Sequence, residues 1–371
     1  MTAEELLKRY EPQQSDTLEY ERQLWQARFA PCGKFLIGTG YDATIQRWRV
    51  NNLVIPAQAG IQEDAYEPLP AFTGHNGWLQ CLAFTRENNR CLTADSWGRM
   101  SCWDYSSETN SDPLWTVPDA LAGWIRTIAV SPDGKLIAVG GNDSTVRILS
   151  TADGKLIRQT TDLPHEIFSL AFHPNGESFV AGDFHGTIRE FETATGEQLR
   201  EFEAVGFYQL NHIQDCGGIR TLAFSKDGSQ LIAGGMKEPS GGFAKGSPVL
   251  QLFDWKSGKQ LHELVAGESQ DGFIYDAWFH PDGFVVGTAS AFPGKGKLFF
   301  WKPGDDKPFF DGKKLTNGRS ITLHPDGHRL AFTQSDSRNA NGRPLKDGEY
   351  TGGTAKIHIL TLPEAVAAVT S

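Results

Sequence analysis

A short turn signature recurs along the chain, and its spacing constrains the fold more than any other feature of the sequence. Six copies end in glycine, most with proline and Asp or Asn before it, and a degenerate seventh copy occupies residues 85–89. An apolar run precedes each copy, and the last residues of these runs are Phe29, Phe84, Val130, Phe172, Phe224, Phe279 and Leu323. These landmarks lie 42 to 55 residues apart. Such a period indicates a repeat array whose neighbouring units share their core.

The third repeat shows what one unit contains. Its four apolar or alternating runs cover residues 125–130, 135–140, 145–149 and 155–160. Tight turns separate them, since proline presets φ and glycine accepts positive φ. Four short strands joined this way form one antiparallel blade. The sequence therefore predicts an all-β fold, a single seven-bladed β-propeller with four antiparallel strands per blade. We number the blades 1 to 7 in the order of the landmarks.

The second repeat resembles a known family. Gly74-His75 before the inner strand and Trp103-Asp104 at the end of the third strand resemble the unit of WD-repeat β-propellers. The resemblance covers residues 15–362 and implies the same propeller fold. Trp97 stands where blades 1 and 3 carry Asp42 and Asp143. We therefore expect the buried polar network typical of the family to be mostly incomplete, so that packing holds the blades together.

The two ends of the chain predict how the ring closes. Residues 356–360 form an apolar strand, but residues 363–368 have poor strand character, so blade 7 lacks an outer strand. Residues 17–21 can fill that position, as an N-terminal strand does in similar propellers, and remove an exposed edge. The expected organisation is a tail or short helix at 1–14, the propeller at 15–362 and a tail at 363–371.

Composition narrows the class of partner. The net charge of −10 gives no general attraction to nucleic acid or anionic lipid. The five cysteines show no CxxC spacing, the N-terminus lacks the features of a secretory signal, and no apolar run reaches the roughly 18 residues that a membrane helix needs. We expect a cytoplasmic protein, monomeric by itself, that binds neither nucleic acid nor membranes.

No catalytic or cofactor motif is evident. The chain has no Gly-x-Ser-x-Gly elbow, no Walker loop and no His-Glu-x-x-His. His173, His280 and His324 occupy equivalent turns on different blades, too far apart to share a metal, and we interpret them as turn formers. We expect no enzyme activity, no cofactor and no metal.

One insertion leaves a metal alternative open. Residues 336–342 resemble the beginning of a calcium loop, although Asp336 and Glu349 each lie one position out of register. A solvated polar loop is the simpler interpretation of residues 335–353.

The candidate site follows from propeller geometry. Loops that enter the inner strands and loops that join second to third strands share one face, around the mouth of the central channel. Aromatic residues and three arginines occur at the positions four and six residues before the landmarks and in the loops that join second to third strands. Aromatic residues and arginine are the types that dominate interface hot spots. The candidate partner-binding residues on this channel-mouth face are Trp25, Tyr41, Trp78, Gln80, Trp124, Arg126, Phe168, Phe184, Arg220, Phe273, Tyr275 and Arg319. Long insertions at 235–247, 290–296 and 335–353 fall on the same face.

The three arginines share one register on blades 3, 5 and 7. They can hold a carboxylate or phosphate, or pair with Glu166, Asp183 or Asp276, which is the commoner use of such residues. The sequence thus predicts a non-enzymatic scaffold that binds a partner peptide or loop, with an acidic or phosphorylated segment as one candidate ligand. The alternative is a propeller hydrolase or lactonase with a channel metal, for which the mouth positions offer only Glu166.

Overall fold

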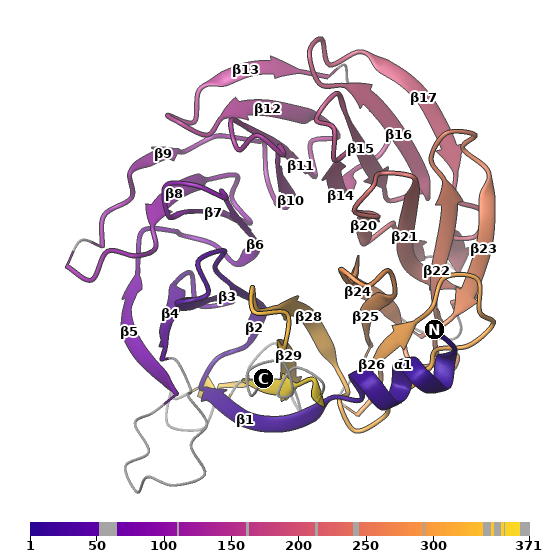
Figure 1. Ribbon diagram of the computed structural model, residues 1–371. Helices are drawn as coiled ribbons and strands as arrows, with labels where there is room; N and C mark the ends of the chain where they lie inside the picture. The colour runs from indigo at the N-terminus through magenta and orange to yellow at the C-terminus, as the bar shows by residue number, and fades with distance from the viewer. Residues whose placement is uncertain are drawn as a thin grey trace, which may run out of the picture.

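Seven four-stranded antiparallel sheets surround a central channel, each with its first strand beside the channel and its last strand at the rim (Figure 1). The structure is a computed structural model. It describes residues 1–51, 65–109, 111–160, 163–211, 214–239, 245–291, 294–336, 343–344, 350–351 and 353–363. The predicted all-β fold of seven four-stranded blades is confirmed.

The strands follow the predicted repeats. Blade 1 contains β2 (Leu24–Phe29), β3 (Phe35–Gly40), β4 (Ile45–Val50) and β5 (Tyr66–Phe72). Blade 2 contains β6 (Leu79–Phe84), β7 (Arg90–Asp95), β8 (Met100–Asp104) and β9 (Trp115–Val117). Blade 3 contains β10 (Ile125–Val130), β11 (Leu136–Gly141), β12 (Val146–Ser150) and β13 (Leu156–Gln159). Blade 4 contains β14 (Ile167–Phe172), β15 (Ser178–Asp183), β16 (Thr187–Glu192) and β17 (Gln198–Glu203).

The remaining blades carry the insertions. Blade 5 contains β20 (Thr221–Phe224), β21 (Gln230–Lys237), β22 (Ser247–Asp254) and β23 (Gln260–Val265). Blade 6 contains β24 (Phe273–Phe279), β25 (Val285–Ser290), β26 (Lys297–Trp301) and β27 (Phe310–Gly312). Blade 7 contains β28 (Gly318–Leu323), β29 (Arg329–Asp336), β32 (Thr354–Thr361) and β1 (Gln13–Tyr20). Outside these sheets lie α1 (Ala3–Tyr10), the hairpin of β18 (Tyr208–Asn211) and β19 (Gln214–Gly217), and the short pair β30 (Arg343–Pro344) and β31 (Tyr350–Thr351).

The hydrophobic core lies between neighbouring blades. One cluster combines Ile37 and Phe72 of blade 1 with Leu82 and Trp103 of blade 2. Each sheet packs face to face against the next, so β3 is buried along its whole length. Because adjacent blades share their core, a single blade cannot bury its own faces.

The ring closes between the two ends of the chain, as predicted. Strand β1 pairs antiparallel with β32, from Gln13 opposite Thr361 to Tyr20 opposite Ala355. A second link lies at the channel wall. The carboxylate of Asp276 in β24 accepts hydrogen bonds from the backbone N–H of Ile321 in β28 and from Arg28 in β2, both at 3.1 Å. One carboxylate therefore connects blades 6, 7 and 1.

Blade 2 contains a complete buried polar network, although we expected Trp97 to interrupt it. Its aspartate is Asp95, two residues earlier, at the end of β7. His75 donates to Asp95 at 2.9 Å and accepts from the Thr93 hydroxyl at 2.8 Å, and the Trp103 indole donates to Thr93 at 2.8 Å. Burial opposes ionisation of Asp95, but hydrogen bonds from His75 and two backbone N–H groups outweigh it and lower its pKa.

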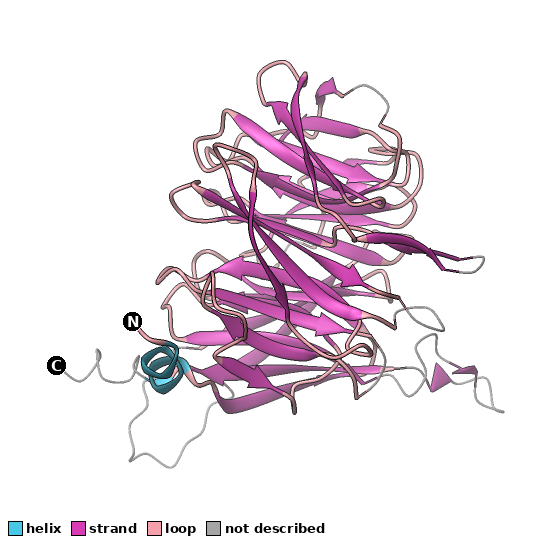
Figure 2. Ribbon diagram, turned by 90° about the vertical axis from the view of Figure 1, so that its right-hand side faces the viewer, coloured by secondary structure: helices cyan, strands magenta, loops and turns pink. Residues whose placement is uncertain are grey.

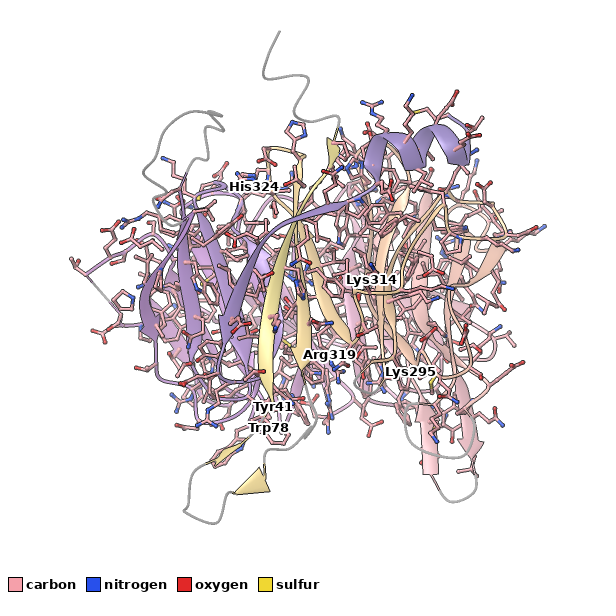
Figure 3. All side chains as sticks on the ribbon, turned by 90° about the horizontal axis from the view of Figure 1, so that it is seen from below. Tyr41, Trp78, Lys295, Lys314, Arg319 and His324 are labelled. Carbon is pink, nitrogen blue, oxygen red and sulfur yellow. The ribbon has the colours of Figure 1, made fainter. Side chains whose placement is uncertain are left out.

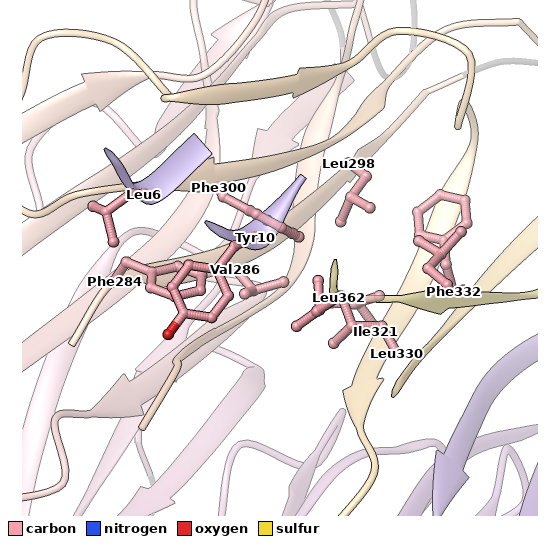
Figure 4. Close-up of a cluster of buried hydrophobic side chains, with 11 residues drawn as sticks. Leu6, Tyr10, Phe284, Val286, Leu298, Phe300, Ile321, Leu330, Phe332 and Leu362 are labelled. Carbon is pink, nitrogen blue, oxygen red and sulfur yellow. The ribbon is translucent and has the colours of Figure 1, made fainter. Parts of the chain in front are cut away.

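Helix α1 covers blades 6 and 7 on the face opposite the channel mouth. Thr2 and Glu5 form a capping box at its beginning. Leu6 and Tyr10 are buried against Phe284 and other residues of both blades (Figure 4), and the Tyr10 hydroxyl donates to the carboxylate of Asp282. Figure 2 views the propeller from its edge, with the helix on one face.

Parts of the predicted insertions and tail lie outside the described residues. They include most of the candidate calcium loop, residues 337–342 and 345–349, and also residues 240–244, 292–293 and 364–371. Among the residues that are described, no helix has the length and apolarity needed to cross a membrane.

Candidate functional site

A β-bulge near the beginning of the inner strand recurs in six blades. The residue displaced from the ladder in each is Trp25, Gln80, Arg126, Phe168, Tyr275 or Arg319. Arg220 occupies the same register directly before β20 in blade 5. Bulges re-aim the side chain of the extra residue, and six of these seven side chains line the central channel. All seven are among the candidates predicted from the sequence.

Ten of the predicted residues contact one another in a closed circle, which we call the mouth ring. On one side, the aromatic rings of Trp25, Tyr41, Trp78 and Trp124 follow one another with centroid separations of 5.6, 5.0 and 5.7 Å. On the other side, guanidinium groups alternate with aromatic rings. This half consists of Arg126, Phe168, Arg220, Phe273, Tyr275 and Arg319.

The arginines hold the ring together through cation–π contacts. Arg126 lies 3.6 Å from the Trp124 ring centroid, and Arg319 closes the circle at 4.8 Å from Trp25. Figure 3 shows Tyr41, Trp78 and Arg319 toward one face, whereas His324 and helix α1 lie at the opposite face. Such contacts contribute about 0.5–2 kcal/mol each, depending on desolvation. The mouth ring is thus a continuous surface of rings and guanidinium groups.

The three arginines of the mouth ring have no carboxylate partner in the described part of the chain. None of the three arginines forms an ion pair with a described residue. Arg126 donates to Asn142 at 2.8 Å and to Gln80 at 3.4 Å, and Arg220 donates to the carbonyl of Gly217 at 2.8 Å. Nε of Arg220 and one Nη of Arg319 are buried without a partner in this part of the chain.

The carboxylates expected to pair with these arginines are engaged elsewhere. Asp183 accepts from Arg189 at 2.6 Å, and Asp276 accepts from Arg28 at 3.1 Å. The expected pairing with Asp183 or Asp276 is therefore wrong, whereas Glu166, the third carboxylate considered from the sequence, acts on Arg126 through its charge without an ion pair. The positive charge of the mouth ring is not neutralised by these two residues.

The electrostatics of the mouth ring reflect this excess charge. Burial, together with the charge of Arg220, lowers the pKa of Arg126 to about 10. Burial and Arg319 lower the pKa of Arg220. Burial opposes ionisation of Tyr275, but the charges of Arg319, Arg220 and Arg126 outweigh it and lower the pKa of its hydroxyl. Three positive charges therefore act on one tyrosine.

Exposure differs around the ring. Trp78 is 46% exposed, and Trp97 beside it, in the loop between β7 and β8, is 69% exposed. Phe273 is only 2% exposed because it packs against Met236 of β21 and beneath Arg220. The free surface is therefore largest at blade 2, whereas Phe273 is a buried member of the ring.

A stack of histidine rings lies beside the mouth ring and was not predicted from the sequence. The rings of His165 and His185 stack at 3.5 Å, and His185 stacks on Tyr208 at 3.8 Å. Tyr208 belongs to the β18–β19 hairpin, and Phe184 connects the stack to Phe168 at 5.5 Å. No sequence pattern before blade 5 indicated that this segment would fold into a hairpin.

The channel beneath the mouth ring is a cavity of about 410 Å³. Its lining contains one carboxylate, Asp276, which Arg28 neutralises. Within the described part of the chain, no three His, Cys, Asp or Glu side chains come together as metal ligands. Glu166, the mouth carboxylate considered from the sequence, is not among the lining residues.

Two family models match the chain. The model of the WD domain, G-beta repeat, matches residues 66–104 and 157–192, and that of the anaphase-promoting complex subunit 4 WD40 domain matches residues 106–165. The match at 66–104 begins with β5 of blade 1 and ends with β8 of blade 2. The sequence repeat therefore spans two blades, which is why the last blade needs a strand from the other end of the chain.

Curated proteins with sequence similarity point to the same family. MST50-interacting protein 11 of Pyricularia oryzae is 30% identical over 166 residues, 43% of this chain and 49% of that protein. Small ribosomal subunit protein RACK1y of Oryza sativa subsp. japonica is 34% identical over 101 residues, 27% of this chain and 29% of that protein. Protein groucho of Drosophila melanogaster is 26% identical over 159 residues, 43% of this chain and 20% of that protein. The match thus spans half or less of each relative. With seven four-stranded blades and a complete His–Asp–Thr–Trp network in blade 2, the chain belongs to the WD-repeat β-propeller family.

Proposed function

We propose that this protein is a non-enzymatic interaction scaffold that binds a peptide or loop of a partner protein on its channel-mouth face. The observation that carries the proposal is the mouth ring, in which rings and guanidinium groups from all seven blades form one continuous surface. Trp, Tyr and Arg contribute most to binding at protein interfaces, because they bury a large area for few rotatable bonds.

The names of relatives support the same class of function. One similar protein is named for its interaction with MST50, and another is named as a protein of the small ribosomal subunit. A third is named as the beta subunit of a guanine nucleotide-binding protein. Those names describe the relatives. For this chain we infer only that a partner protein is the expected class of ligand.

Nothing in the channel favours the hydrolase or lactonase alternative. A metal site there would need carboxylates or histidines from several blades, and the lining offers Asp276 alone, already bound to Arg28. We also propose a cytoplasmic location, which the five free cysteines of the structure suit.

Affinity purification followed by mass spectrometry tests the binding face. The test variant combines Trp78→Ala with Trp124→Ala, and its matched control combines Leu156→Ala with Leu261→Ala, two exposed apolar residues on outer strands. We expect at least one partner to be lost from the first variant and all to be retained by the second, with both still cooperatively folded. Equal recovery of every partner by all three proteins would refute the assignment of the face.

A further inference from the structure

The arginines of the mouth ring differ from the other buried arginines of the described chain. Arg189 is 7% exposed and pairs with Asp183 and Glu201 at 2.6 and 3.0 Å. Arg47, 2% exposed, donates to the carbonyl of Pro70 with two of its nitrogens and to that of Ser107 with a third. These two buried guanidinium groups are thus paired within the protein, because unpaired buried donors cost free energy, whereas the mouth arginines are only partly buried.

At the channel mouth the same chain leaves guanidinium donors unused. Arg319 interacts with the Tyr275 hydroxyl but leaves one Nη without a described partner, and Arg220 donates to described residues only through one Nη, to a carbonyl. Aromatic faces hold both groups in place, with Arg220 4.1 Å from Phe168 and Arg319 4.4 Å from Tyr275. Fixed, undersatisfied guanidinium groups are ready to bind an anion without reorganisation.

The three positive charges of the mouth arginines favour a phosphate monoester over a carboxylate as the ligand. Arg126 and Arg220 lie over the same ring, Phe168, at 5.2 and 4.1 Å from its centroid. Arg319 lies over Tyr275, at 4.4 Å, and Tyr275 lines the cavity of about 410 Å³. A carboxylate supplies one negative charge, whereas a phosphate monoester supplies nearly two, with three strongly accepting oxygens. The guanidinium fork matches either geometry, but only the dianion offsets most of the excess charge.

We propose that Arg126, Arg220 and Arg319 form a binding site for the phosphate monoester of a phosphorylated side chain, which the partner segment inserts into the channel mouth. This inference rests on the proposed function, since it gives the chemistry of the partner at the same face. The surrounding rings would contact the residues that flank the phosphorylated one, and the chain's net charge of −10 disfavours longer polyanions such as nucleic acid.

Isothermal titration with three peptides tests the anion. The probes are Ala-Ala-phosphoserine-Ala-Ala and the same peptide with serine or with glutamate at the centre. We expect binding of the phosphopeptide to exceed that of the other two by roughly tenfold or more, as for loss of charge-assisted hydrogen bonds. Because the second phosphate pKa is about 6, its affinity should fall between pH 7.5 and pH 5.5. Equal binding of the glutamate peptide, or no preference for phosphate, would overturn the proposal.

Variants separate this site from general folding effects. Arg220→Gln and Arg319→Gln should each weaken phosphopeptide binding by roughly tenfold. Arg49→Gln, which changes an arginine of β4 that pairs with Glu67, should not. Arg319→Lys should restore part of the binding. Without ligand, Arg319→Gln loses its cation–π contacts with Trp25 and Tyr275 but also removes an unneutralised charge. We therefore expect a melting temperature within a few degrees of the wild type. A clearly lower melting temperature together with unchanged phosphopeptide binding would show that Arg319 has a structural role only.

The two proposals fail in different ways. If Trp78→Ala/Trp124→Ala loses partners but phosphatase treatment of the lysate leaves their capture unchanged, the face is right and the phosphate site is wrong. If the tryptophan variant retains every partner, the face itself is wrong. Loss of the same partner by the tryptophan variant and by phosphatase treatment supports both.

Discussion

At the scale of single residues, polar groups are distributed unevenly among the blades. Thr93 connects His75 and Trp103 in the buried network of blade 2, accepting from one ring and donating to the other. Thr39 of blade 1 is equally buried, but its hydroxyl has no partner among the described residues. The same residue type therefore stabilises one blade and contributes only packing in another.

Substitution of these two threonines measures the network directly. Thr93→Val removes the hydroxyl and leaves two buried ring nitrogens unpaired, so we expect a loss of about 2–4 kcal/mol in the free energy of unfolding. Thr39→Val, with the same change in shape, removes a buried hydroxyl without a described partner, so we expect it to be neutral or stabilising. Urea denaturation monitored by tryptophan fluorescence gives both values, and equal losses would show that the network adds no stability.

The site residues that could be predicted from the sequence are those whose spacing the repeat preserves. The bulged positions were found because they lie four residues before the landmarks, a spacing that the repeat preserves. Asp95 was missed because its position is occupied by Gly40 and Gly141 in the flanking blades, so the repeat gave no signal there. The burial of Phe273 depends on Met236 from a strand extended by an insertion, and no local pattern reveals that contact.

At the scale of elements, helix α1 links the N-terminus to the turn of blade 6. The imidazole of His280 stacks on Phe284 at 4.3 Å and contacts Tyr10 at 5.1 Å, with the Asp282 carboxylate 3.7 Å from its Nδ1. The corresponding histidines of two other blades hydrogen-bond to a carbonyl in the turn of the next blade. His173 bonds to Gly228 at 3.1 Å, and His324 bonds to Gly33 at 2.8 Å. His280 packs against helix α1 instead. The three turn histidines therefore join elements as well as forming turns.

This burial predicts a pH dependence of stability. Desolvation, opposed by Asp282 and aided by Arg9, lowers the pKa of His280 from 6.5 to about 4. The unfolded chain then binds a proton more readily than the folded one between these values, so stability falls as the pH falls from 6.5 toward 4. At pH 5 we expect a loss of about 2 kcal/mol from this residue relative to pH 7. His280→Gln should remove that part of the slope in urea denaturation at the two pH values; an unchanged slope would contradict the assignment.

The closing strand is the second element whose role can be measured. Deletion of residues 1–11 removes α1 and the burial of Leu6 and Tyr10, at an expected loss of about 3 kcal/mol. Deletion of residues 1–20 also removes β1 and leaves β32 as an exposed edge, so we expect loss of cooperative unfolding and aggregation. Calorimetry and size-exclusion chromatography compare the two proteins. Equal behaviour would mean that β1 does not close the ring.

At the scale of the whole molecule, the propeller separates two faces with different chemistry. The strand pattern, the blade number and the closure were predictable, because the repeat period and turn residues carry them along the whole chain; the inner strand at residues 125–130 has the bounds expected from the sequence. The continuity of the mouth ring was not predictable, because it depends on contacts between blades that are far apart in sequence, such as Arg319 with Trp25.

Hydroxyl-radical footprinting of the protein with a captured partner tests the binding face most directly. Trp78 and Trp97 are 46% and 69% exposed on the channel-mouth face, and Leu156 and Leu261 are 57% and 53% exposed on outer strands. We expect the complex to show reduced oxidation of the two tryptophans and unchanged oxidation of the two leucines. Full reactivity of Trp78 and Trp97 in the complex, with protection of the outer strands, would contradict the placement of the partner at the channel mouth.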